Sequence, residues 1–151
     1  MTSRRNSKKA GASSPMGGGA SSSGNQDILG RVPPHSAEAE AAVLGAILRR
    51  GDAIYNVADI IQADDFYLPA HQLIFSSFID LFNRKQPIDA LTVAEDLISK
   101  AQLDEAGGSI YLAELLDAVV SAANAEHYAG IVKGRSIQRS LINACSGIIG
   151  R

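Results

Sequence analysis

The spacing of apolar residues most restricts the fold of this chain, because it is helical in every long segment after residue 36. Apolar side chains there recur three and four positions apart, and no segment alternates apolar with polar residues as a half-buried strand does. We therefore predict an all-α fold, with a compact head of about five helices followed by one longer helix. The helices predicted for the head span residues 37–50, 53–62, 69–84 and 90–100, and a fifth begins at Ser109.

Residues that start and stop helices lie between these segments. Ser36 and Asp89 are well suited to cap the helices that follow them, and Asn124 is a candidate cap for the last helix. Gly51 and Pro87 are expected to end helices. The apolar residues expected to face the core from the helix over 90–100 are Leu91, Val93, Ala94, Leu97 and Ile98.

The last segment differs from the head in its charge and in its apolar pattern. Residues 35–126 hold five Lys and Arg against 15 Asp and Glu, whereas residues 127–151 hold four basic residues and no acid. Its apolar pairs Leu141/Ile148 and Ile142/Ile149 are seven residues apart, as packing against another long helix requires. We therefore divide the chain into an arm (1–30), a helical head (31–123) and a helix that needs a partner (124–151).

Composition narrows the class of protein. The 151 residues carry a net charge of −2, so the chain as a whole is not a strongly basic nucleic-acid coat. The Ser/Gly-rich basic arm has too few apolar residues to fold and is expected to be disordered. No apolar run is long enough to cross a membrane or to act as a secretory signal, which favours the cytoplasm. An organellar transit peptide is disfavoured, because the arm lacks an amphipathic face.

No catalytic, cofactor or metal site is evident in the sequence. The segment GASSSG (19–24) has the glycine spacing of a phosphate-binding loop, but Asn25 and Gln26 stand where lysine and Ser or Thr belong. The three histidines are isolated, and His71 is interpreted as a hydrogen-bonded structural residue. The pair Asp64 and Asp65 is more typical of a helix cap than of acid–base catalysis. The residues alone therefore indicate an all-α interaction module that is not an enzyme.

Five segments resemble one known family in their order and spacing. They are VPPHSAEAEAAVLGAIL (32–48), DDFYLPAHQLIF (64–75), PIDALTV (87–93), LDEAGGSIYLAELL (103–116) and SAANAEHYAGIVKGRSIQRSLI (121–142). Together they resemble the N-terminal domain of the bacterial replicative DNA helicase, the DnaB family, over about 120 residues. The resemblance implies a compact helical head followed by the first arm of a helical hairpin.

What the family does is implied by this resemblance. Its members are hexameric rings that unwind DNA with ATP and Mg²⁺ bound in a C-terminal domain that also contacts most of the DNA. The N-terminal domain is non-catalytic and serves ring assembly and docking of the C-terminal domain of primase. The resemblance leaves open whether a helicase loader also contacts this domain. The implied subunit-interface residues are Ile131, Leu141, Ile142, Cys145, Ile148 and Ile149, and the implied partner-binding residues are Lys133, Arg135 and Arg139.

Two further expectations follow from the sequence. The chain ends before the second arm of the family's hairpin, so dimerisation is expected to be weak and the apolar face of the last helix exposed. An alternative function is direct DNA binding through the basic arm and the basic residues of the last helix, with an affinity that falls steeply with salt. The acidic head disfavours this alternative.

Overall fold

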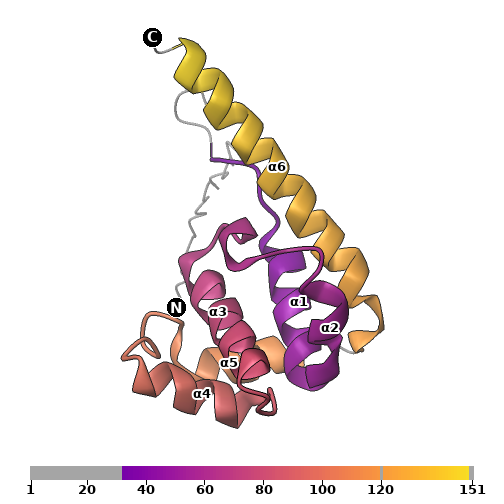
Figure 1. Ribbon diagram of the computed structural model, residues 1–151, viewed down its shortest axis with the longest axis vertical. Helices are drawn as coiled ribbons and strands as arrows, with labels where there is room; N and C mark the ends of the chain where they lie inside the picture. The colour runs from indigo at the N-terminus through magenta and orange to yellow at the C-terminus, as the bar shows by residue number, and fades with distance from the viewer. Residues whose placement is uncertain (1–31, 120, 150–151) are drawn as a thin grey trace, which may run out of the picture. The chain divides into compact units, whose positions relative to one another are not determined.

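The computed structural model describes residues 32–119 and 121–149, and all of their regular structure is helical. The predicted all-α class is confirmed. The chain divides into the units Met1–Val32 and Pro33–Arg151, and the helices belong to the second (Figure 1). None of the described helices is long and apolar enough to cross a membrane. The α-helices are α1 (Ala37–Arg49), α2 (Ile54–Val57), α3 (Pro69–Asn83), α4 (Ala90–Ser99), α5 (Gly108–Asp117) and α6 (Ala125–Ile149), with 3₁₀ turns η1 (Gly51–Ala53), η2 (Ala63–Asp65) and η3 (Ala122–Asn124).

Local sequence signals account for most of the helix starts. The Ser36 hydroxyl accepts a hydrogen bond from the Ala39 amide, and the Asp89 carboxylate accepts one from the Thr92 amide. Both predicted caps are thereby confirmed. The predicted cap at Asn124 is wrong, because Asn124 lies inside η3 and its side chain bonds to no other described residue; the Ser121 hydroxyl caps η3 by accepting from the Ala123 amide.

The second helix is shorter than predicted. It ends at Val57 rather than at residue 62, and the Ile60 and Ile61 amides both bond back to the Val57 carbonyl. The chain leaves the helix here because Gln62 opens η2, where the Asp65 carboxylate accepts from the Gln62 amide. The apolar residues predicted for this helix, Ile54, Val57 and Ile61, are nevertheless buried.

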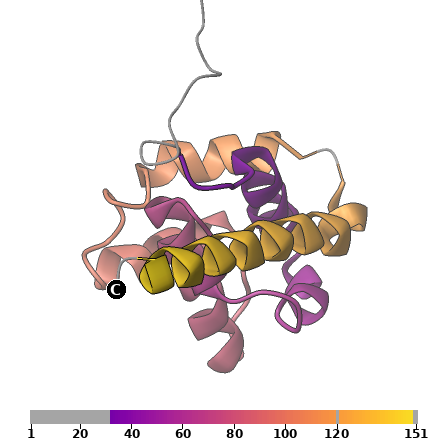
Figure 2. The same cartoon turned by 90° about the horizontal axis from the view of Figure 1, so that it is seen from above.

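Helix α1 lies at the centre of the head. Val43, Leu44 and Ile47 are fully buried, and α1 packs against α3, α5 and α6, the last of which crosses it (Figure 2). At Gly45 the contact with α5 is so close that a Cβ atom would lie 2.3 Å from the Leu115 carbonyl oxygen. The aromatic residues Phe66, Phe75 and Phe78 are also buried in this core.

Two of the five residues predicted to face the core from α4 are exposed instead, whereas Val93, Ala94 and Leu97 are buried. Val93 and Leu97 are fully buried, but Leu91 and Ile98 are 68% and 60% exposed. At 100° per residue, Leu91 and Ile98 lie about 100° to 160° around the helix from Val93 and Leu97. Only one side of α4 is covered, by α3 and α5, so the other side faces solvent.

Candidate interaction surface on the last helix

Helix α6 is packed on the head over its inner half, which we define as residues 125–136. Ala125, Ala129 and Val132 are at most 4% exposed and pack against the core that α1 dominates. They are spaced i, i+4 and i+7, so they form one stripe on the helix. Figure 1 shows α6 continuing past the other helices toward its C-terminal end.

Ile131, predicted to lie in a subunit interface, packs against the core of its own chain. It is half-buried against the head. Eleven residues later, Ile142 lies on nearly the same side of α6 but is 51% exposed. The difference arises because eleven residues of helix advance about 16 Å, which takes Ile142 beyond the head.

A polar cluster joins the middle of α6 to η2. We call Asp65, Lys133, Ser136 and Arg139 the Asp65 anchor. The Asp65 carboxylate accepts from the Ser136 hydroxyl at 2.7 Å and pairs with the Lys133 ammonium at 3.4 Å. Burial alone raises the pKa of Asp65, but hydrogen bonds from Ser136 and the Gln62 amide, together with the Lys133 charge, outweigh burial and lower the pKa below its ordinary value.

Arg139 completes this anchor through the backbone. Its guanidinium donates to the Asp65 carbonyl at 2.6 Å and to the Pro34 carbonyl at 2.9 Å. The same group lies 5.5 Å from the centre of the Tyr67 ring, and His35 stacks on Tyr67 with ring centres 4.1 Å apart. Arg139 therefore connects α6 to both segments that precede helices α1 and α3.

The expectation that all three basic residues face outward needs correction. Lys133 and Arg139 point to the head, because a buried carboxylate and two free carbonyl oxygens attract them there. Arg135 is half-buried, and its side chain makes no ion pair or hydrogen bond with another described residue. Of the three, only Arg135 has a side chain without a polar partner among the described residues.

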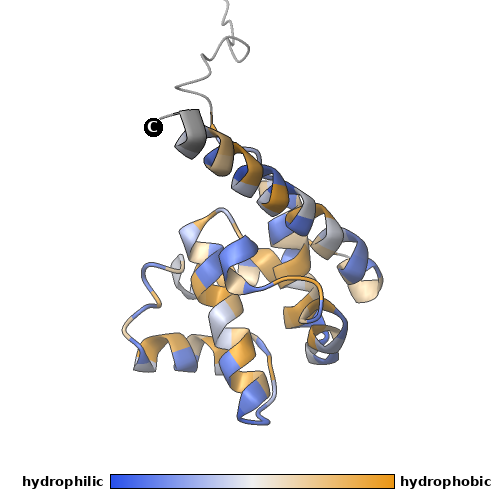
Figure 3. Ribbon diagram, turned by 45° about the horizontal axis from the view of Figure 1, so that its top comes forward, coloured by the Kyte–Doolittle hydropathy of each residue, from blue (hydrophilic) through white to orange (hydrophobic). Residues whose placement is uncertain are grey.

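The outer half of α6, residues 137–149, exposes an apolar stripe. Ile137, Leu141 and Ile142 are 50%, 61% and 51% exposed, and Cys145 is also exposed. Figure 3 shows apolar and polar positions interleaved along α6. Ile137, Leu141 and Cys145 are spaced i, i+4 and i+8 and lie on the side of α6 opposite Ala125, Ala129 and Val132. We call Ile137, Leu141, Ile142 and Cys145 the α6 stripe.

The structure describes only some of the predicted interface residues at the end of α6. Cys145, which the resemblance assigns to a subunit interface, is exposed in the single chain. The side chains of Ile148 and Ile149 lie outside the described residues. The role of the predicted interface residues in binding another subunit stays a prediction.

A buried polar network in the head was missed by the sequence analysis. Glu40 is 1% exposed, and its carboxylate accepts from the Tyr67 amide at 2.7 Å and contacts His71 Nδ1 at 2.8 Å. His71 Nε2 in turn contacts the Tyr111 hydroxyl at 2.5 Å. The prediction of a hydrogen-bonded His71 is confirmed. Burial raises the pKa of Glu40, but the hydrogen bonds from His71 and from the backbone outweigh burial and lower it overall.

This network joins α1, α3 and α5 at one point of the core. Glu40 precedes Leu44 by four residues and Ile47 by seven, and this inward spacing was the signal available in the sequence. In the part of the chain that the structure describes, no group of three or more His, Cys, Asp or Glu side chains is placed to hold a metal ion.

Comparison with known proteins decides the family. The family model described as the DnaB-like helicase N-terminal domain matches residues 32–134, more than half of the chain. The chain belongs to the DnaB-like helicase N-terminal domain family. The matched range contains Asp65 and Lys133 of the Asp65 anchor, and the resembling segments 64–75 and 121–142 contain all four of its residues.

Relatives of this family agree in sequence and in structure. Replicative DNA helicase DnaB of Geobacillus stearothermophilus is 45% identical over 118 residues, which are 78% of this chain and 26% of that protein. The N-terminal domain of DnaB helicase from Mycobacterium tuberculosis has a TM-score of 0.77 and 39% identity over 79% of this chain and 83% of that one.

A third solved structure is the N-terminal domain of DnaB helicase from Helicobacter pylori, described with its interactions with primase. It has a TM-score of 0.64 and 25% identity, covering 75% of this chain and 88% of that one. The chain spans about a quarter of the length of the curated DnaB relatives that it matches.

Proposed function

We propose that this chain is the non-catalytic assembly and primase-docking domain of a replicative DNA helicase. The observation that carries the proposal is the α6 stripe, a row of exposed apolar side chains on a helix that is fixed to a folded head. Exposed apolar residues that are contiguous on one face are typical of protein–protein contacts. The helicase activity of the whole protein, with ATP and Mg²⁺ bound outside these residues, belongs to the same proposal.

In this proposal the two halves of α6 have different tasks. The α6 stripe, continued by Ile148 and Ile149, pairs with a helix of another subunit, and the Asp65 anchor fixes the direction in which α6 leaves the head. Ile131 supports the start of that interface from within the core. Arg135 is the basic residue best placed for a partner, because Lys133 and Arg139 already have partners in the head.

The relatives support the part of the proposal that concerns primase. The Helicobacter pylori structure is described with primase interactions, and a DnaB-like replicative helicase of similar fold is described in the same way. Direct DNA binding receives less support, because two of the three basic side chains implicated on α6 contact the head rather than solvent.

Self-association is tested by replacing one residue of the α6 stripe. Ile142→Asn places an amide where the partner helix would pack, and we expect the equilibrium constant for self-association to fall at least about ten-fold. Sedimentation velocity over a concentration series gives this constant. The matched control is Ile98→Asn, because Ile98 is also an exposed helical isoleucine but lies on α4. If both variants self-associate as strongly as the original chain, the proposed interface is wrong.

Primase docking is tested by nuclear magnetic resonance. The isotope-labelled chain is titrated with the C-terminal domain of the cognate primase, and shifts are expected at Arg135 and along the outer half of α6. Arg135→Ala should reduce the affinity while leaving the chain folded, since the Arg135 side chain makes no ion pair or hydrogen bond with another described residue. Shifts confined to α4 would show that the docking site has been placed wrongly, and a phosphate-release assay checks that the chain alone does not hydrolyse ATP.

A further inference from the structure

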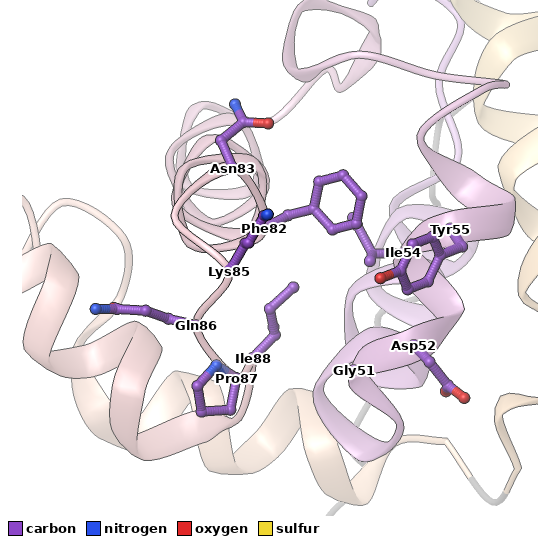
Figure 4. Close-up of a pocket in the computed structure, with 10 residues that line it drawn as sticks. All are labelled: Gly51, Asp52, Ile54, Tyr55, Phe82, Asn83, Lys85, Gln86, Pro87 and Ile88. Carbon is purple, nitrogen blue, oxygen red and sulfur yellow. The ribbon is translucent and has the colours of Figure 1, made fainter.

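A groove separate from α6 lies between α2 and the end of α3. It has a volume of about 780 Å³ and shares no residue with the α6 stripe. In Figure 4, Phe82 and Ile88 point into the groove toward Ile54 and Tyr55, whereas Asn83 and Gln86 point away from it. The groove therefore has an apolar floor and a polar rim. We call it the α2–α3 groove.

An exposed aromatic side chain borders the α2–α3 groove. Tyr55 is 65% exposed and meets Phe82 edge-on, with ring centres 5.0 Å apart. Its hydroxyl makes no hydrogen bond to another described residue. A tyrosine in this state offers apolar area and a free donor together, which is the combination that binding surfaces use.

The unmatched charge at the groove is a cation. Asp52 is paired with Arg50 at 3.0 Å, but the Lys85 ammonium makes no ion pair or hydrogen bond with another described residue. Lys85 also has φ +59°, a left-handed conformation that favours glycine at the end of a helix. The fold thus holds an exposed lysine in a strained conformation at the rim of an apolar groove, inside a head that is otherwise strongly acidic.

The backbone of the groove wall also has free hydrogen-bonding groups. Ile88 is only 8% exposed, and neither its N–H nor its C=O bonds to another described residue. Gly51 packs closely against this part of the wall, because a Cβ atom at position 51 would lie 3.0 Å from the Ile88 carbonyl oxygen. Backbone groups without a protein partner can bond to water or to the backbone of a ligand.

We propose that the α2–α3 groove binds an extended peptide segment of another protein in which an acidic residue stands next to an apolar one. The apolar side chain enters between Ile54, Phe82 and Ile88, and the carboxylate meets the Lys85 ammonium and the Tyr55 hydroxyl. The peptide backbone supplies partners for Ile88. A peptide that alternates an acidic residue with an apolar one offers this neighbouring pair at every position along its chain.

The test uses two synthetic peptides of about six residues, one alternating aspartate with leucine and one alternating lysine with leucine. Binding to the full chain is measured by fluorescence anisotropy, and the site is mapped by amide shifts. We expect the acidic peptide to bind with shifts at Tyr55, Lys85 and Ile88, and the basic peptide to bind at least about five-fold more weakly.

The decisive variants are Lys85→Gly and Ala101→Gly. Both residues have a positive φ, +59° and +56°, but only Lys85 lines the groove. Both substitutions relieve the same strain and should raise the unfolding midpoint by a few degrees, about 4 °C. Lys85→Gly alone should weaken binding of the acidic peptide, by about five-fold. This comparison separates loss of the ligand contact from any change in stability.

Several results would overturn the proposal. These are no binding of the acidic peptide, equal binding of the two peptides, equal affinities for the two glycine variants, or shifts confined to the first 31 residues. Tyr55→Ala provides one more test. If it alters self-association of the chain and leaves peptide binding unchanged, the groove is a contact between copies and the peptide assignment is wrong. None of these outcomes depends on the interface proposed for α6.

Discussion

Replacing Asp65 with alanine tests whether the Asp65 anchor holds α6 on the head. The change removes the cap bond from the Gln62 amide and the buried hydrogen bond from Ser136, each of which contributes about 1 kcal/mol. It also removes the pair with Lys133, which contributes no more than about 0.5 kcal/mol because that side chain is 42% exposed. The bonds from Arg139 remain, since they go to backbone carbonyls. The expected loss is about 2 to 2.5 kcal/mol.

Urea unfolding followed by far-ultraviolet circular dichroism measures this loss as a change in the free energy of unfolding. Asp64→Ala is the matched control, because Asp64 is the neighbouring residue, is exposed and makes no hydrogen bond to another described residue. Its effect should stay within about 0.5 kcal/mol. Hydrogen exchange adds spatial resolution, since amides in the outer half of α6 should exchange faster in Asp65→Ala while those of α4 are unchanged.

A double-mutant cycle shows whether the reasoning about individual contacts is correct. Asp65→Ala and Ser136→Ala should give a coupling energy of about 1 kcal/mol, because each side chain loses the same hydrogen bond. Two results refute the reasoning: additivity of the two changes, and equal losses for Asp65→Ala and Asp64→Ala. In either case the Asp65 carboxylate contributes nothing to holding α6 that its exposed neighbour does not.

Three further predictions concern the head. The pKa values of Asp65 and Glu40 are lower in the folded chain than in the unfolded one. The two ionised carboxylates therefore stabilise the fold fully above about pH 5, and this stabilisation is lost as the pH falls through and below about 4. A series of urea unfolding midpoints at different pH values detects the loss. Glu40→Gln should lower the free energy of unfolding by about 2 kcal/mol, because the new amide NH₂ would face the Tyr67 amide and the His71 ring nitrogen, which donate to the carboxylate. A thermal melt indistinguishable from that of the original chain would contradict this prediction. Gly45→Ala should lower the free energy of unfolding by about 3 kcal/mol or more, because the new Cβ atom would lie 2.3 Å from a backbone oxygen of α5. Gly134→Ala should raise it by about 1 kcal/mol in the same unfolding assay, because no atom lies within 4 Å of the new Cβ.

The helices were predictable because their signals are local. Ser36 and Asp89 mark helix starts through bonds to amides only three residues away, and apolar spacing fixes the inward side of α1 without any knowledge of its neighbours. The same reasoning failed on α4, where Leu91 and Ile98 are as apolar as the buried Leu97. Which side of α4 is covered depends on where α3 and α5 lie, and the sequence of α4 alone does not determine their positions.

The polar contacts of the candidate site were not predictable for the same reason. Lys133 and Arg139 carry no local sign that their partners are Asp65 and the carbonyl of Pro34, which are 68 and 105 residues distant in sequence. From the sequence alone, a basic segment without acidic residues is interpreted as a surface that is free to bind a partner. The structure shows instead that an acidic turn and free carbonyl oxygens of the same chain attract two of its charges.

The position of the Asp65 anchor explains how α6 can present an exposed apolar surface and remain helical. An isolated helix as short as the outer half would be marginal in water, because nucleation is unfavourable below about 12 to 15 residues. The outer half avoids nucleation by continuing the inner half, which is already packed on the core. Because the anchor joins the two halves, the direction of the α6 stripe is set before any partner arrives, and less conformational freedom is lost on binding. Weakening the anchor should therefore reduce partner affinity even though none of its residues belongs to the stripe.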